Sequence, residues 1–147
     1  MYDYVLPGEI MKTERPGIQE IIRIITEFFS TDDHARVVLV YGSTAKGELR
    51  AHSDVDIAVA GNGPIPIDRL AQYQQGLEAR LDRGVDLIDL NRVEGLILHR
   101  AVTGGIKIKT DQAMFARLHI KALGFYEDYL PLLRRMRSEK LKRFING

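Results

Sequence analysis

The sequence predicts a single domain of the α/β (α+β) class, in which a mixed β-sheet is flanked by helices. Short apolar runs of strand length alternate with amphipathic helical patterns in the order α-β-α-β-α-β, which is typical of a sheet covered by helices. The 147 residues are enough for one domain with a sizeable core, and no repeat or convincing linker divides them. We expect the core at about residues 17–110 and a helical segment at about 111–147.

Helices are expected where apolar residues recur at helical spacing, and strands where β-branched residues gather. The predicted helices lie at 18–29, 42–47 (a tight turn opening a short helix) and 67–81, and the predicted strands at 37–41, 54–60 and 85–90. A helix-containing connection joins the second and third strands, which predicts that these two are parallel and adjacent. The short connection between the first two strands permits an antiparallel pair.

The C-terminal part is expected to add a helix at 93–103, a short edge strand at 106–109 and a long helix from about Asp111. Pro131 is expected to kink or break that last helix. From Pro131 to the last residue, six basic residues occur against one acidic residue, which we interpret as a solvated helical face. Aromatic residues at helical spacing are interpreted as core, and these are Phe115, Phe125, Tyr126 and Tyr129.

The composition excludes several classes of protein. A net charge of +1 argues against a chain built to coat nucleic acid or an anionic membrane, so direct nucleic-acid binding is not expected. The absence of cysteine excludes disulfides, thiolate metal sites and cysteine nucleophiles. No apolar run approaches the ~18 residues of a membrane span, and the first twelve residues do not resemble a secretory signal. We therefore expect a cytoplasmic protein.

Two aspartates one residue apart stand at the start of the second predicted strand. Residues two apart in a strand point to the same side, so Asp54 and Asp56 project together. Because buried carboxylates are costly, such a pair needs a cation, a partner or water. Two oxygen ligands without a soft ligand nearby suit Mg²⁺ or Mn²⁺ better than zinc. A single Asp-x-Asp is also common at solvent-facing strand starts, so the pair needs further support.

The turn after the first predicted strand supplies that support. Glycine lets backbone N–H groups approach a phosphate, and the start of a helix favours an anion, so Gly42 and Ser43 are nucleotide-binding candidates. Ser43 can add a hydroxyl donor. Ser53, directly before the aspartate pair, is a further nucleotide-binding candidate. The turn and the pair together predict a site that holds a triphosphate on one side and its metal ions on the other.

A third carboxylate would complete a site with two metal ions. The third predicted strand offers Asp86 and Asp89, which point to opposite faces because they are three residues apart. If the second and third strands are parallel and start level, Asp86 lies beside Asp54 and Asp56. We therefore choose Asp86, and interpret Asp89 as a solvated or salt-bridged residue at the end of the strand.

The combination Gly42-Ser43, ten intervening residues and Asp54-Val55-Asp56 resembles the signature of the polymerase-β-like nucleotidyltransferase superfamily. The small size and the stretch GVDLIDLNR resemble its minimal nucleotidyltransferase branch, the MNT or MntA-type antitoxins. The resemblance implies two Mg²⁺ ions, held by Asp54, Asp56 and Asp86, around a nucleoside triphosphate held by Gly42 and Ser43. Many relatives have arginine where this chain has Lys46, so the resemblance makes Lys46 a further nucleotide-binding residue. Lysine keeps the charge of arginine without its bidentate fork.

The resemblance also implies a function: transfer of AMP from ATP to a tyrosine hydroxyl of a HEPN-domain RNase toxin encoded alongside, which silences that toxin. The short chain leaves little room for a pocket for a small acceptor, which favours a macromolecular partner. Two alternatives stay open. The chain could neutralise the toxin by forming a complex without any transfer, or it could be a nucleotidyltransferase with a small-molecule acceptor.

Overall fold

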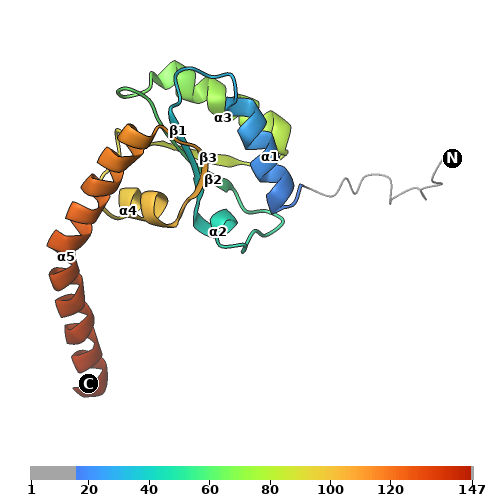
Figure 1. The fold of residues 1–147 in the computed structure, drawn as a ribbon. Coiled ribbons are helices and arrows are strands. Elements are labelled where there is room, and N and C mark those ends of the chain that lie inside the picture. The colour runs from blue at the N-terminus through green and yellow to red at the C-terminus, as the bar shows by residue number, and fades with distance from the viewer. Residues whose placement is uncertain (1–15, 147) are drawn as a thin grey trace, which may run out of the picture.

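The computed structural model describes residues 16–146, apart from the side chains of Tyr126 and Asn146. The first fifteen residues lie outside the described residues, and with them the twelve that are expected not to be a secretory signal. The elements follow the predicted order (Figure 1). They are α1 (Ile18–Phe29), β1 (Val37–Tyr41), α2 (Gly42–Ala45), β2 (Val55–Ala60), α3 (Ile67–Leu81), β3 (Val85–Asp89), α4 (Gly95–Gly104), β4 (Ile106–Lys109) and α5 (Gln112–Asn146).

The four strands form one mixed sheet in the order β3-β2-β1-β4. β1 pairs antiparallel with β2 and with β4, and β2 pairs parallel with β3. These pairings confirm the mixed sheet, the parallel second and third strands and the short edge strand. The helix-containing crossover explains the parallel pair, because the chain must return to the starting edge of the sheet before it can enter β3.

Helices cover both faces of the sheet (Figure 1). On one face, α1 and α3 pack their buried residues, such as Ile25 and Leu77, against Val40 and Ile57. On the other face, α4 and the first turns of α5 pack Leu98 and their other buried residues against the opposite side chains of β1 and β2. Alternate residues of each strand therefore enter different cores, as the two-residue period of a strand requires.

The C-terminal helix was expected to kink or break at Pro131. α5 continues through Pro131 without a break, although its axis changes direction partway along, and it extends well beyond the body (Figure 1). Proline removes one backbone hydrogen bond from the turn before it. Glu127, whose carbonyl is freed, is exposed, so water can satisfy that carbonyl. Phe115 and Phe125 are half-buried, but Tyr129 is 48% exposed, so the assignment of Tyr129 to the core is wrong. The side chain of Tyr126 lies outside the described part.

The remaining boundaries shift by one or two residues, which is the usual uncertainty at element ends. Asp54 precedes β2, α4 begins two residues later than expected, and Leu90 follows β3. Among residues 16–146, no helix is both long and apolar enough to cross a bilayer.

Candidate active site

A row of three polar side chains crosses the sheet at the end of β1. Tyr41 is the register partner of Asp56, and Asp56 is the register partner of Asp86. Residues in register point to the same side of a sheet, and Tyr41 packs with the core beneath α4, so the row lies on the α4 face. Asp54 precedes Asp56 by two residues and projects with it. The structure therefore brings all three predicted carboxylates to one face.

The turn after β1 lies directly against one of these carboxylates. Gly42 has φ +68°, a conformation that side chains rarely adopt, and a Cβ built on it would collide with Oδ2 of Asp56. Two independent constraints thus require glycine at residue 42: the backbone conformation and the contact with the carboxylate of Asp56. The predicted phosphate-binding turn and the predicted metal ligand are immediate neighbours.

A second glycine makes room for Asp54. A Cβ on Gly84 would collide with Oδ1 of Asp54. The preceding residue, Arg83, donates through one terminal nitrogen to the carbonyl of Arg50 at 2.7 Å, and to those of Ala51 and Ser53 at 3.4 and 3.3 Å. Arg83 therefore ties the loop before Asp54 to the start of β3. Sequence reasoning missed this contact, because an arginine in a turn shows no spacing that reveals its partners.

Ser53 forms two hydrogen bonds within the same loop. Its hydroxyl accepts a hydrogen bond from the backbone N–H of Arg50 at 3.1 Å, and its own N–H donates to the carbonyl of Arg50. These bonds close a tight turn before Asp54 and give Ser53 a structural role in the described chain. Its assignment to nucleotide binding stays a prediction.

The choice of Asp86 over Asp89 agrees with the geometry. Asp89 is 4% exposed and accepts hydrogen bonds from the N–H groups of Ile65 at 2.7 Å and Asn91 at 2.9 Å. It also forms an ion pair with Arg92 at 3.3 Å. Asp89 is salt-bridged, as expected, but buried rather than solvated. Asp86 is exposed on the face that carries Asp56.

The acidic cluster has a distinctive electrostatic environment. Partial burial, followed by the charges of Asp86 and Asp54, raises the pKa of Asp56 above its ordinary value. Burial, followed by the charges of Asp86 and Asp56, raises the pKa of Tyr41 to about 12. The Tyr41 hydroxyl is therefore a protonated donor at neutral pH. Sequence reasoning missed Tyr41, since a tyrosine at the end of an apolar run looks like an ordinary core residue.

This environment fits a hard divalent cation. Three carboxylates share one face without an ion pair to any of them among the described residues, and a cation would relieve their mutual repulsion. In the positions that the side chains of residues 16–146 adopt, no three acidic or histidine side chains surround a common point that could hold a metal ion. The assignment therefore depends on the shared face and the donor chemistry.

An open cleft of about 580 Å³ lies beside the cluster, within the range of about 300–1,000 Å³ that is typical of ligand pockets. One wall contains Gly42, Ser43, Lys46 and Asp56. The assignment of Lys46 to nucleotide binding stays a prediction. The opposite wall comes from the C-terminal half of α4. Its residues, which sequence reasoning missed because they follow no motif, are His99, Arg100, Thr103 and Gly104.

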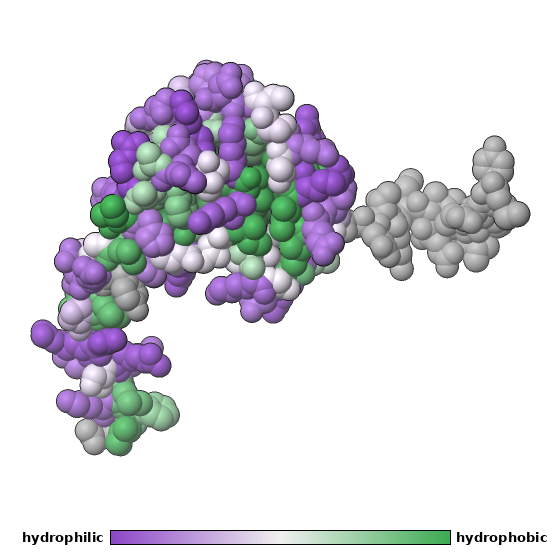
Figure 2. Space-filling view, in the orientation of Figure 1, coloured by the Kyte–Doolittle hydropathy of each residue, from purple (hydrophilic) through white to green (hydrophobic). Residues whose placement is uncertain are grey.

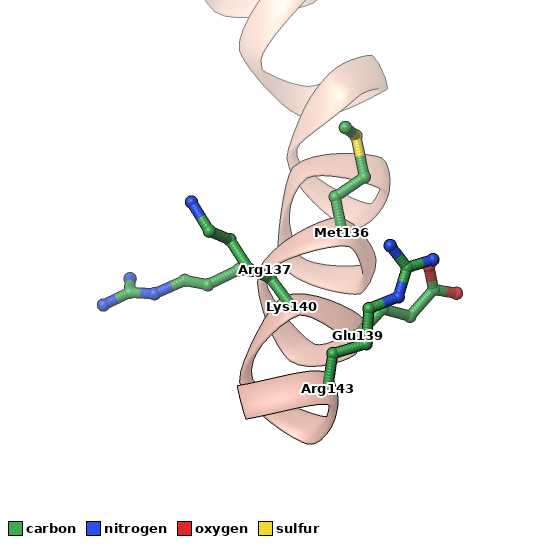
Figure 3. A pocket seen from close by; sticks show the side chains of 5 residues that line it. All are labelled: Met136, Arg137, Glu139, Lys140 and Arg143. Carbon is green, nitrogen blue, oxygen red and sulfur yellow. The ribbon is translucent and has the colours of Figure 1, made fainter. Parts of the chain in front are cut away.

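A second hollow of about 540 Å³ lies on the far part of α5 (Figure 3). Its lining residues, Met136, Arg137, Glu139, Lys140 and Arg143, all belong to that one helix. It has no opposing wall and cannot enclose a small ligand. The cleft beside the aspartates is therefore the candidate active site.

Comparison with known proteins identifies the family. Residues 23–113 match the family model described as "Polymerase beta, Nucleotidyltransferase". Over 97 residues the chain is 29% identical to the protein adenylyltransferase MntA of Shewanella oneidensis. That match covers 63% of this chain and 66% of the relative, slightly less than two thirds of its length.

Two solved structures share the fold. A toxin–antitoxin crystal structure with AMP-PNP superposes with a TM-score of 0.66 at 21% identity, over 82% of this chain and 98% of the matched chain. A structure of a tri-AMPylated HEPN toxin of Shewanella oneidensis in complex with its MNT antitoxin gives a TM-score of 0.64 at 19% identity. It covers 84% of this chain and 98% of the matched chain.

Proposed function

Because this chain belongs to the polymerase beta nucleotidyltransferase family, we propose that it is a Mg²⁺-dependent protein adenylyltransferase and an antitoxin. It moves AMP from ATP to a hydroxyl group, that of a tyrosine, on a partner HEPN-domain RNase toxin. One observation carries the proposal: Asp54, Asp56 and Asp86 lie on one face, and Asp56 lies against Gly42 and lines an open cleft.

The residues that line the cleft and the two aspartates beside Asp56 have complementary roles. Asp54, Asp56 and Asp86 supply the oxygen ligands for two Mg²⁺ ions. Gly42 and Ser43 offer backbone N–H groups and a hydroxyl to the triphosphate, and the ammonium group of Lys46 lies on the same wall of the cleft. When bound, the Mg²⁺ ions neutralise the carboxylates and stabilise the negative charge of the phosphates.

The reaction exchanges one P–O bond for another. The acceptor hydroxyl oxygen attacks the α-phosphorus, the bond to the pyrophosphate breaks, and Asp86 helps to remove the hydroxyl proton. The protein mainly positions the two reactants, because phosphoryl transfer gains most of its acceleration from orientation and electrostatics. The Tyr41 hydroxyl, held protonated beside Asp56 and Asp86, is a further donor toward an anionic oxygen in the cleft.

A protein acceptor is supported by the relatives and by the shape of the site. The curated relative is a protein adenylyltransferase, and one structure of the same fold contains an AMPylated HEPN toxin. The cleft is open, so a side chain of another protein can enter it. We propose that the catalytic core (17–110) and the helical segment (111–147) act as one domain, 1–147, and that the reaction takes place in the cytoplasm, where ATP is available.

The first experiment is incubation with α-³²P-labelled ATP, Mg²⁺ and the HEPN-domain protein encoded beside this chain. The wild type should label the partner, and Asp54→Asn should not. Asp68→Asn is the matched control, because Asp68 is an exposed aspartate of α3, on the opposite face of the sheet, and its loss should leave labelling unchanged. A stable complex without label would favour an antitoxin that acts by binding alone. Label on a small hydroxyl compound but not on the protein would favour a small-molecule acceptor.

A further inference from the structure

The far part of α5 exposes an unusual number of large apolar side chains. We call residues 126–146 the distal arm. Beyond the body of the molecule this arm carries apolar residues along its length (Figure 2), and Phe144 is 86% exposed. The exposed apolar residues of the arm are Tyr129, Leu132, Leu133, Met136, Leu141, Phe144 and Ile145. A surface of this kind marks an interaction site more often than a monomer surface.

The arm continues the buried face of the same helix. Met114, Leu118 and Ala122 follow each other at four-residue spacing and are buried against the body. Phe125 follows on this face and lies against the first residue of α4, where a Cβ on Gly95 would lie 3.2 Å from its ring. Tyr129 stacks on Phe125 with ring centroids 4.4 Å apart. The face therefore continues past the end of α4 with no described element to cover it.

The charge of the arm restricts what can cover it. From Pro131 onward six basic residues occur against Glu139 alone, and the basic side chains of Figure 3 surround the arm. A second copy of this chain would bring like charges together, which disfavours self-pairing. Lys140 and Arg143 follow Leu133 and Met136 after seven residues, two helical turns further along the same face. A flat lipid surface would have to bury these charges beside the apolar residues, whereas a protein can offer carboxylates at those points.

The arm lies on the side of the molecule that carries the cleft. β4 ends opposite Val38, at the end of β1 remote from Tyr41, so α5 begins there and runs back toward the site. At about 1.5 Å per residue, α5 spans roughly 50 Å, against roughly 17 Å for a five-residue strand. It therefore passes the N-terminal end of α4, where Phe125 lies against Gly95, with α4 between it and α2. From there the arm projects beyond the body at the end of the molecule where α2 lies (Figure 1).

We propose that the distal arm is the docking surface for the acceptor protein. The matching surface on that protein is a helix or helix pair with exposed apolar side chains, flanked by carboxylates that pair with Arg137, Lys140 and Arg143. Docking there holds the acceptor beside the cleft without occupying it. This proposal rests on the proposed function, because it names where the substrate of that same site is held.

The test compares two arm variants with a matched control. Leu133→Glu/Met136→Glu disrupts the apolar face, and Arg137→Glu/Lys140→Glu/Arg143→Glu reverses the charge. All five side chains are exposed, so neither variant removes a core contact. Ile67→Glu is the control, because Ile67 is a 72% exposed apolar residue of α3, on the opposite face of the sheet. Calorimetry measures binding of the adjacent HEPN-domain protein and, separately, of AMP-PNP with Mg²⁺.

Both arm variants should bind the partner at least tenfold more weakly and raise the KM for the acceptor, with the affinity for AMP-PNP unchanged. Ile67→Glu should behave as wild type. Unchanged partner affinity in both arm variants overturns the proposal. So does a wild-type dimer that the apolar variant dissociates, or arm-dependent binding to phosphatidylglycerol vesicles together with unchanged partner affinity.

The two proposals fail in different ways. If the wild type labels the partner and the arm variants do so with unchanged KM, docking at the arm is wrong while the transferase stands. If the wild type binds the partner through the arm but transfers no label, the docking surface stands and catalysis is wrong.

Discussion

Gly42 and Asp56 touch so closely that any side chain at residue 42 would overlap the carboxylate of Asp56. Gly42 also has φ +68°. The turn proposed to hold the phosphates and the carboxylate proposed to hold the metal therefore share one packing contact. A side chain introduced at residue 42 must therefore displace the carboxylate of Asp56.

Gly42→Ala should reduce AMP transfer by at least about 100-fold, the range seen when one preorganised group of an active site is lost. The Cβ displaces Asp56 and strains the backbone, and the strain costs about 1 kcal/mol of stability. Gly47→Ala is the matched control, because Gly47 has a similar φ of +74° but open space around it. Transfer rates and melting temperatures of both variants separate the two effects. Equal transfer rates in Gly42→Ala and Gly47→Ala would show that the Gly42–Asp56 contact does not matter for catalysis.

Asp86→Asn should affect activity and Asp89→Asn should affect stability, although the two residues are only three apart. Asp86→Asn should abolish transfer and leave stability unchanged or slightly higher, because it removes a charge that repels Asp56. Asp89→Asn should lower stability by about 1.5–3 kcal/mol, since the buried carboxylate accepts two backbone hydrogen bonds and pairs with Arg92. Urea unfolding and the labelling assay measure both quantities. Active Asp86→Asn protein would remove Asp86 from the site.

Arg83 is expected to act as a positioning residue for Asp54. Arg83→Met frees the loop carbonyls of Arg50, Ala51 and Ser53, so the preceding loop should no longer hold Asp54 in place. We expect about a tenfold higher Mg²⁺ concentration for half-maximal transfer, with partial rescue in Arg83→Lys, which can still donate to a carbonyl. Arg80→Met is the control, because Arg80 contacts only the ring of Phe28 among the interactions described. A lower melting temperature with an unchanged Mg²⁺ requirement would mean that Arg83 is merely structural.

Asp32 should make stability depend on acid pH. Burial alone would raise the pKa of this carboxyl, but hydrogen bonds from the Ala35 N–H, the Tyr73 hydroxyl and the His34 N–H outweigh it and lower the pKa below 3.8. A lowered pKa in the folded state stabilises the protein above the unfolded value, and this contribution is lost as the pH falls through the folded value. Stability should therefore decrease below about pH 4.

Tyr73→Phe isolates this contribution. The hydroxyl lies 2.8 and 2.9 Å from the two carboxylate oxygens of Asp32, so its loss should cost about 1–2 kcal/mol at pH 7. The cost should shrink at pH 3, where Asp32 becomes protonated in the unfolded chain and increasingly so in the folded one. Urea midpoints of wild type and variant at the two pH values measure the difference. A cost independent of pH would show that the hydroxyl does not favour the charged carboxylate.

Local patterns predicted the elements well because their physics is local. The run from Val37 to Tyr41 forms a strand, and the helical pattern over 67–81 forms α3 with these bounds. The sequence also predicted that β2 and β3 are parallel, since the connection between them contains a helix. It could not predict how far along α5 the apolar face would be covered. Periodicity shows that Tyr129 and Met136 share an apolar face with Ala122, but burial depends on where α4 ends.

The amino-acid sequence by itself determined that Asp54 and Asp56 project together, because a strand repeats every two residues, and that a Gly-Ser turn follows the first strand. Only the tertiary structure decided that Asp86 is level with Asp56, that Tyr41 completes the row, and that Arg83 holds the loop before Asp54. It also decided that α4 forms the second wall of the cleft. The physical reason is that these contacts join residues far apart in the chain, and strand register and helix packing position them rather than any spacing along it.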